Sequence, residues 1–195
     1  MKKLTAKHAG FTLVELLIVI VVIAILAAIT IVAYNGIQQR AYNTRIVQGV
    51  AQYETALESY KAINGEYPKT SREQAGEHIS LTCLGTGYPD NTCGTVTGVE
   101  VSEDGVFNTA MQTILASSPP ALGDNLIHVD GESFAGAVYG GDDTTHSSTH
   151  YARTIQYALL GKDQDCVLSG AWAYNTTTSP ATTACEIDLE EMPQP

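Results

Sequence analysis

The sequence predicts an α+β protein in which one long N-terminal α-helix, membrane-spanning in its first half, packs on a small antiparallel β-sheet. First, Leu16–Ala33 contains no charged residue, and Thr30 is its only polar one. Second, apolar residues continue at helical spacing from Tyr34 to Tyr60. Third, the chain after Lys69 is rich in glycine, threonine and serine and contains short β-prone segments. A helix followed by a run of strands is an α+β arrangement.

The uncharged segment is just long enough to cross a bilayer. Its eighteen residues make roughly 27 Å of helix, close to the thickness of the hydrocarbon core. Lys2, Lys3 and Lys7 precede it, and the positive-inside rule places that end in the cytoplasm. An ordinary secretory signal, cut after Ala27-Ala28, is the alternative interpretation.

Glu15 places one carboxylate at the outer lip of this apolar segment. An ionisable group there is costly in lipid and is a functional candidate by default. A carboxylate removed from water needs a partner. The alternative is a glutamate that reaches the headgroups and has no further role.

The segment Gly10–Glu15 combines a glycine, an aromatic residue and then a glutamate four residues further on, behind a basic leader. This pattern resembles the processing site of type IV prepilins, including their pseudopilin relatives. The resemblance implies that a prepilin peptidase cuts between Gly10 and Phe11 and methylates the new amine of Phe11. It also implies that Glu15 of one subunit pairs with the Phe11 amine of another and sets the subunit register in a filament.

One feature departs from the family pattern. Many members carry a proline in the second half of the span, whereas residues 10–67 contain none. Gly36 and Gly49 are the weak points of the predicted helix, each costing about 1 kcal/mol relative to alanine. We therefore expect any local melting of the helix at these glycines.

Beyond Ala33 the helix is predicted to become amphipathic and to bury one stripe against a sheet of the same subunit. It should run from about Thr12 to Ile63, because Asn64-Gly65 is a stop signal and Pro68 forbids continuation. The stripe comprises Tyr34, Ile37, Ala41, Tyr42, Ile46, Val50, Tyr53, Leu57 and Tyr60.

Short elements are predicted in the remaining chain. We expect a helical turn within Ser71–Ser80, with Ser71 and Gln74 in capping-box spacing, and a helix over Val106–Ser117. Strands are predicted at Ala135–Tyr139 and Trp172–Tyr174, and a hairpin joins Thr154–Leu160 to Cys166–Leu168 through the turn Gly161–Asp165. Asn175–Thr183 is predicted as a polar loop and Glu186–Pro195 as a ragged acidic tail.

The four cysteines, Cys83, Cys93, Cys166 and Cys185, form no C-x-x-C pair, so zinc or dithiol redox chemistry is not indicated. An even count downstream of an export signal favours disulfides. Three pairings exist, and the local ones, Cys83–Cys93 and Cys166–Cys185, close the shortest loops. The second pair also resembles the bounds of the variable C-terminal loop of type IV pilins.

Composition excludes several classes of function. The net charge is −11, and losing the three leader lysines would take it to −14, which argues against a nucleic-acid site. Asp142, Asp143, His146 and His150 are weak metal-ligand candidates in a loop that we expect to be solvated. No catalytic constellation or cofactor motif is evident, so neither enzyme activity nor a cofactor is predicted.

The resemblance implies four segments. Residues 1–10 are the leader, 11–33 the transmembrane and filament-core helix, 34–63 its amphipathic half, and 64–195 a globular domain with disulfide-closed loops. The expected partners are copies of the chain in a helical filament, the prepilin peptidase and the assembly machinery in the membrane. The chain would lie in the cytoplasmic membrane before assembly and in an extracellular pilus afterwards.

The role of the filament stays open between adhesion, motility and DNA uptake. A minor pilin and a type II secretion pseudopilin are alternatives within the class. From a different class, a monomeric membrane-anchored extracellular binding domain would keep its leader and tolerate Glu15→Leu.

Overall fold

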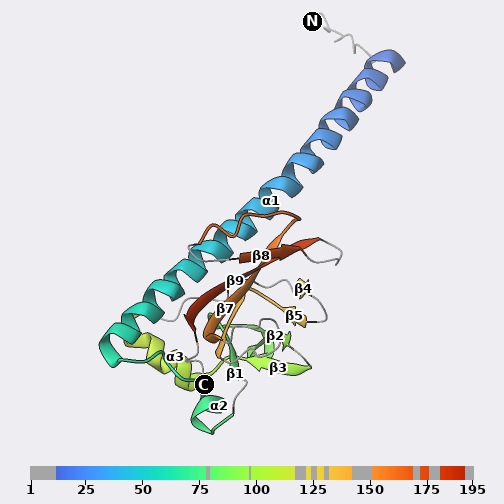
Figure 1. The fold of residues 1–195 in the computed structure, drawn as a ribbon. Coiled ribbons are helices and arrows are strands. Elements are labelled where there is room, and N and C mark those ends of the chain that lie inside the picture. The colour runs from blue at the N-terminus through green and yellow to red at the C-terminus, as the bar shows by residue number, and fades with distance from the viewer. Residues whose placement is uncertain are drawn as a thin grey trace, which may run out of the picture. The chain divides into compact units, whose positions relative to one another are not determined.

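The computed structural model describes residues 12–77, 80–96, 98–116, 122–123, 127–129, 132–141, 151–168, 172–175 and 181–191. The chain divides into two compact units, Met1–Arg40 and Ala41–Pro195. The long helix α1 (Leu13–Asn64) runs through the boundary between them, and the sheet belongs to the second unit (Figure 1). The predicted α+β class is confirmed.

Helix α1 ends at Asn64, one residue beyond the predicted end at Ile63 and at the predicted stop signal Asn64-Gly65. The N–H of Gly65 donates to the carbonyl of Lys61 at 2.8 Å. Gly65 has φ +84°, the left-handed conformation that closes helices and that glycine adopts without a steric penalty.

The buried stripe of α1 is shorter than predicted. Ile46, Val50, Tyr53 and Leu57 are at most 1% exposed, and Tyr42 and Tyr60 are half-buried. The stripe was also expected to bury three residues nearer the N-terminus. Those side chains, Tyr34, Ile37 and Ala41, are exposed.

The described residues form one sheet of nine strands in the order β4-β5-β2-β3-β1-β6-β7-β9-β8. The strands are β1 (Ser80–Cys83), β2 (Thr92–Val96), β3 (Val99–Ser102), β4 (Ile127–Val129), β5 (Glu132–Phe134), β6 (Ala137–Gly141), β7 (Tyr151–Leu160), β8 (Trp172–Asn175) and β9 (Thr182–Glu191). The sheet is mixed, because β1 and β3 pair in parallel through Thr82 and Ser102. The prediction of a small antiparallel sheet is wrong for this one pair. The β2–β3 hairpin reverses the chain, so β3 returns alongside β1 in the same direction.

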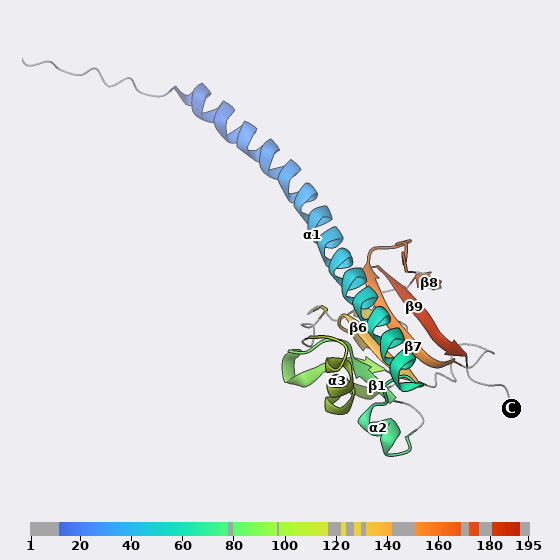
Figure 2. The ribbon, with the colours of Figure 1, turned by 90° about the vertical axis from the view of Figure 1, so that its left-hand side faces the viewer.

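One face of the sheet packs against helices. The Ala41–Asn64 part of α1 and the short helix α3 (Gly105–Gln112) lie on this face, as Figure 2 shows. Tyr139 of β6 opposes Ile155 of β7, which opposes Ile187 of β9, so the three side chains form a row beneath the helices. The ring of Phe107 on α3 lies 4.8 Å from the ring of Tyr139. Burial raises the pKa of the Tyr139 hydroxyl well above its usual value.

The opposite face holds a smaller cluster around the first disulfide. Val138 and Ala158 alternate in sequence with the residues that face α1, and they pack with Val101 and Ala184 near Cys83. This period of two along each strand explains how adjacent residues supply two cores.

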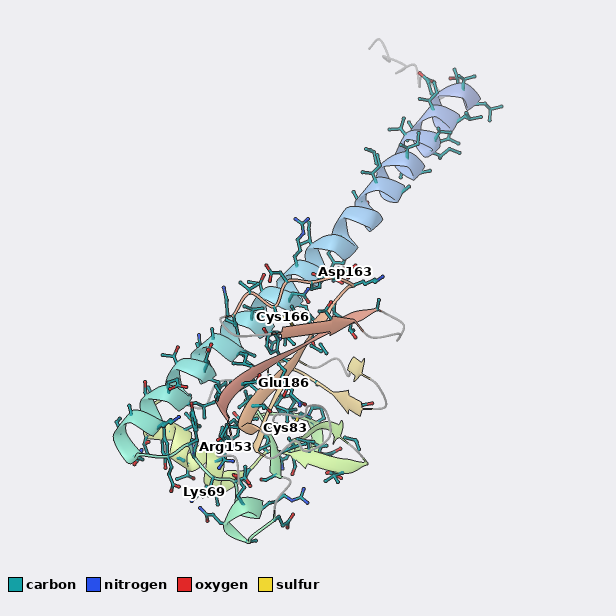
Figure 3. The ribbon with its side chains drawn as sticks, viewed as in Figure 1. Lys69, Cys83, Arg153, Asp163, Cys166 and Glu186 are labelled. Carbon is teal, nitrogen blue, oxygen red and sulfur yellow. A yellow bond between two sulfur atoms is a disulfide. The ribbon has the colours of Figure 1, made fainter. Side chains whose placement is uncertain are left out.

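The predicted N-terminal cap of the first short helix is one residue out of position. Helix α2 (Ser71–Gln74) has a capping box formed by Thr70 and Glu73, one residue before the predicted pair of Ser71 and Gln74. Thr70 is 1% exposed, and Glu73 pairs with Arg153 of β7 at 2.7 Å, so tertiary contacts select this register. Figure 3 labels Arg153 at this site.

Helix α3 begins at its N-cap Asp104, whose carboxylate accepts the N–H of Phe107 at 2.8 Å. It ends at Gln112, five residues before the predicted end at Ser117, because residues 113–115 form a turn that bonds back to Ala110 and Met111. The predicted strand over Ala135–Tyr139 begins at Ala137 instead, after Gly136 with φ +73°.

The predicted hairpin between Thr154–Leu160 and Cys166–Leu168 is wrong. Strand β7 pairs with β9, from Leu160 opposite Thr182 to Tyr151 opposite Glu191. Residues 166–168 turn instead, because Val167 has φ +54° and the N–H of Leu168 bonds back to the carbonyl of Cys166.

Two described segments after residue 171 form strands, and one of them lies where a tail was predicted. Strand β8 confirms the strand expected at Trp172–Tyr174. The ragged tail expected from Glu186 is wrong as far as Glu191, which ends β9, and Glu186 is only 6% exposed. The rest of that tail, and residues 176–180 of the expected polar loop, lie outside the described residues.

Candidate functional site at the start of the long helix

Thr12 and Glu15 form a reciprocal capping box at the start of α1. The backbone N–H and the hydroxyl of Thr12 both donate to Oε2 of Glu15, each at 2.8 Å. The N–H of Glu15 donates to Oγ1 of Thr12 at 3.2 Å. Two of the unpaired N–H groups at the helix N-terminus are thereby satisfied, and the carboxylate is held at the helix end where negative charge is favourable.

Sequence reasoning singled out Glu15 but missed Thr12. The signal was present as Thr-Leu-Val-Glu, the spacing of a capping box directly before an apolar segment. Gly10 and Phe11, the predicted cleavage and methylation residues, lie outside the described residues. Thr12 is therefore the first described residue, and it directly follows the predicted mature N-terminus.

The helix behind this capping box is apolar on every side. Among the described residues, one helical segment, Leu13–Thr30, has the length and composition to cross a membrane, and none of it is buried within the chain. The only polar side chain after Glu15 in this segment is Thr30, whose hydroxyl donates to the carbonyl of Ala27. Such a surface requires lipid or other protein to cover it.

Both predicted disulfides are present. Cys83–Cys93 and Cys166–Cys185 have Cα–Cα distances of 5.8 and 5.7 Å. Figure 3 labels Cys83 and Cys166 in different parts of the domain. Each bridge closes a short loop and restricts the unfolded chain.

The predicted metal candidates Asp142, Asp143, His146 and His150 lie outside the described residues. Within the described ranges, no group of three or more His, Cys, Asp or Glu side chains is arranged to hold a metal ion.

Comparison with known proteins shows similarity over part of the chain. It is 35% identical to the type IV major alpha-pilin of Moraxella bovis over 104 residues, which cover 45% of this chain and 65% of that relative. It is 37% identical to fimbrial protein Q of Moraxella bovis over 89 residues, covering 45% of this chain and 56% of the relative. It is 36% identical to type II secretion system core protein G of Escherichia coli (strain K12) over 86 residues, covering 43% and 59%. No solved structure matches the chain.

Residues 5–31 match the family described as the prokaryotic N-terminal methylation motif. The match contains Gly10, Phe11, the Thr12–Glu15 capping box and nearly all of the apolar helix. The chain is similar to type IV pilins and to a type II secretion core protein. The relatives named above are described as a pilin, a fimbrial protein and a secretion core protein.

The similarity rests on part of each protein. The chain spans 56% to 65% of the length of the three relatives named here. The resemblance predicted from Gly10–Glu15 is confirmed.

Proposed function

We propose that the chain is a structural subunit of a type IV pilus. It is made as a membrane-anchored precursor, cut after Gly10 by a prepilin peptidase, methylated at Phe11 and polymerised through α1 into a surface filament. One observation carries this proposal: a carboxylate is fixed at the start of an uncharged, fully exposed helix within the methylation motif.

The capping box explains how cleavage and assembly are connected. Cleavage before Phe11 creates a cation one residue from Thr12, whose N–H already bonds to Glu15. In an apolar environment a carboxylate is stable only with a charged or hydrogen-bonding partner. The Phe11 amine of the same or a neighbouring subunit supplies that charge, and only one axial offset between neighbouring helices brings the two groups together.

The apolar helix serves two environments in turn. Before assembly, Leu13–Thr30 lies in the cytoplasmic membrane, because its length matches the hydrocarbon core. After extraction by the assembly machinery, the same side chains pack against those of other copies. Neighbouring subunits then cover these side chains in place of lipid, and the globular domain lies on the outside of the filament.

A type II secretion pseudopilin is the second candidate. The similarity to core protein G favours it, and the first steps are the same. The Cys166–Cys185 bridge favours a pilin, since it closes a C-terminal loop of the kind that pilins carry. Electron microscopy of sheared surface material distinguishes the two: abundant long filaments indicate a major pilin, whereas their absence indicates a pseudopilin or a minor pilin.

Mass spectrometry of the N-terminus tests the proposal directly. We expect the chain recovered from membranes that contain a prepilin peptidase to begin at Phe11 with one added methyl group. A Gly10→Val variant should retain Met1, and an Ala9→Ser variant, which leaves the glycine in place, should be processed normally. An intact leader in the unaltered chain, or a cut after Ala27-Ala28, would contradict the proposal and favour a monomeric anchored domain or an ordinary signal peptide.

A further inference from the structure

The middle of α1 is shaped around one side chain from a distant segment. A β-carbon at Gly49 would lie 2.2 Å from Cδ2 of Leu122 and 3.2 Å from its Cγ and Cδ1. Real β-carbons essentially never approach another atom so closely. Leu122 is 4% exposed and packs in the same core as Ile46 and Val50, the neighbours of Gly49 on the buried stripe. Gly49 is therefore a notch that receives Leu122.

A tyrosine positions the backbone of Leu122. The N–H of Leu122 donates to the hydroxyl oxygen of Tyr88 at 3.3 Å, and that hydroxyl donates to the carbonyl of Leu84 at 2.7 Å. Burial raises the pKa of Tyr88, so the hydroxyl keeps the proton that this second bond requires.

Two further glycines let the Leu122-Gly123 segment pass close to its neighbours. A β-carbon at Gly123 would lie 2.9 Å from the hydroxyl of Tyr42 on α1 and 3.1 Å from the backbone nitrogen of Gly136. A β-carbon at Gly136 would lie 2.7 Å from the hydroxyl of Tyr88. The segment thus lies between α1 and Tyr88 without room for additional side chains.

Tyr88 belongs to the loop closed by the Cys83–Cys93 bridge. Both cysteines are at most 1% exposed. The Glu103 carboxylate accepts the N–H groups of Gly87 and Tyr88 at 2.7 and 2.9 Å. The disulfide and this carboxylate together fix the position of the tyrosine hydroxyl.

We propose that the Cys83–Cys93 loop, Tyr88 and Leu122 form a clasp that locks α1 at Gly49. The clasp converts a glycine, which weakens a helix, into a rigid attachment point. A disulfide more than thirty residues away in sequence then controls how readily residues 46–53 of the helix open. This inference is independent of leader cleavage and of filament assembly.

Hydrogen exchange of the oxidised full-length chain in detergent micelles tests the clasp. Leu122→Ala should raise the exchange rates of amides 46–53 by at least about tenfold relative to β7 and β9, as expected for truncating a buried leucine. Gly49→Ala should have a similar effect, because its methyl group collides with Leu122. Leu189→Ala is the matched control: it truncates a leucine of β9 that is partly buried in the same core, next to Tyr67 rather than Leu122, and it should leave the exchange of amides 46–53 relative to β7 unchanged.

The double variant gives the sharper result. Gly49→Ala in the Leu122→Ala background should restore much of the protection, since the new methyl group occupies space that the leucine vacates. The two changes are then strongly non-additive. Additive losses, or a Gly49→Ala variant as protected as the unaltered chain, would overturn the clasp. If Leu122→Ala does not fold, Leu122→Val provides the same comparison with a smaller truncation.

The two disulfides provide the final comparison. Replacing Cys83 and Cys93 by serine should increase exchange in amides 46–53 selectively, whereas replacing Cys166 and Cys185 should not. Equal effects of the two replacements, or a uniform increase over the whole domain, would show that the first bridge stabilises the domain globally and would contradict the proposal.

Discussion

The carboxylate of Glu15 accepts two hydrogen bonds from Thr12, one from its backbone N–H and one from its hydroxyl, while the hydroxyl oxygen of Thr12 accepts the N–H of Glu15. Glu15 therefore has a structural role that does not depend on any second subunit. Its helix-capping role and its proposed charge-pairing role must be separated experimentally. The capping box itself offers the means, because glutamine can replace glutamate at its third helical position.

Glu15→Gln is predicted to keep the helix start and to abolish assembly. The glutamine carbonyl can still accept from Thr12, but it carries no charge to pair with the Phe11 amine. We expect a processed N-terminus and a loss of most sheared filaments, measured by mass spectrometry and electron microscopy. Thr12→Ser keeps both halves of the capping box and should assemble normally. Normal filament yield from Glu15→Gln would reduce Glu15 to a cap and remove the register hypothesis.

The ion pair between Glu73 and Arg153 is predicted to stabilise the globular domain. Their nitrogen–oxygen distance is 2.7 Å, and the side chains are only 13% and 15% exposed. Glu73→Gln retains the capping box with Thr70 but removes the charge beside a largely buried guanidinium. We expect a loss of about 3 kcal/mol in unfolding free energy, the lower end for removing one partner of a buried pair.

Urea unfolding of this domain within the full chain measures that loss, and an exposed pair supplies the control. Glu66 and Lys69 lie at 2.8 Å but are 63% and 43% exposed. Glu66→Gln should change the unfolding free energy by less than about 1 kcal/mol. Equal effects of the two substitutions would contradict the assignment of the Glu73–Arg153 pair as a tertiary link between α2 and β7.

Acidification is predicted to destabilise the domain through Asp104. Desolvation raises the pKa of this carboxyl, but hydrogen bonds from Ser71 and from the N–H groups of Phe107 and Val106 outweigh it, and the pKa is lowered overall. A pKa lower in the folded state than in the unfolded state gives stability that is present above about pH 4 and is lost as the pH falls through the folded-state value.

Thermal unfolding between pH 5 and pH 2 measures this contribution. Asp104→Asn should preserve the N-cap of α3, since asparagine caps as well as aspartate, and should flatten the decline in unfolding temperature below about pH 4. An unchanged pH profile in Asp104→Asn would show that other carboxylates cause the acid loss.

The sequence predicted elements whose signal is local and repeated. The period of Ile46, Val50, Tyr53 and Leu57 specifies a buried helix face whatever lies opposite. The disulfide pairing agrees with the rule that cysteines close in sequence pair most readily, because the loops they close are short. The N-terminal methylation motif was predictable for the same reason, since its glycine, phenylalanine and glutamate stand within six consecutive positions.

Other features depend on partners that are distant in sequence. The cap at Thr70 is selected by burial and by Arg153, eighty-three residues away by number. The turn at Val167 follows from bonds made by its neighbours: the Tyr157 hydroxyl donates to the carbonyl of Cys166 at 2.5 Å, and Asp165 accepts the N–H of Val167 at 3.1 Å. No local pattern specifies such contacts.

Strand β9 was missed for a different reason. Its alternation of acidic and apolar residues over Glu186–Glu190 is a strand signal, but the charges suggested a solvated tail. The segment pairs with β7 on one side and β8 on the other, so it forms a strand as its alternation indicates.

Gly36 within α1 and Gly65 directly after its last residue are predicted to respond oppositely to substitution by alanine. A β-carbon at Gly36 would meet no atom within 4 Å, and its backbone is helical, so Gly36→Ala should stabilise the helix by about 1 kcal/mol. A β-carbon at Gly65 also meets nothing within 4 Å, but φ there is +84°. Gly65→Ala should therefore destabilise the helix end by about 1 kcal/mol through backbone strain alone. Hydrogen exchange of the amides within one turn of each site measures both effects, and slower exchange at Gly65→Ala or faster exchange at Gly36→Ala would contradict this account.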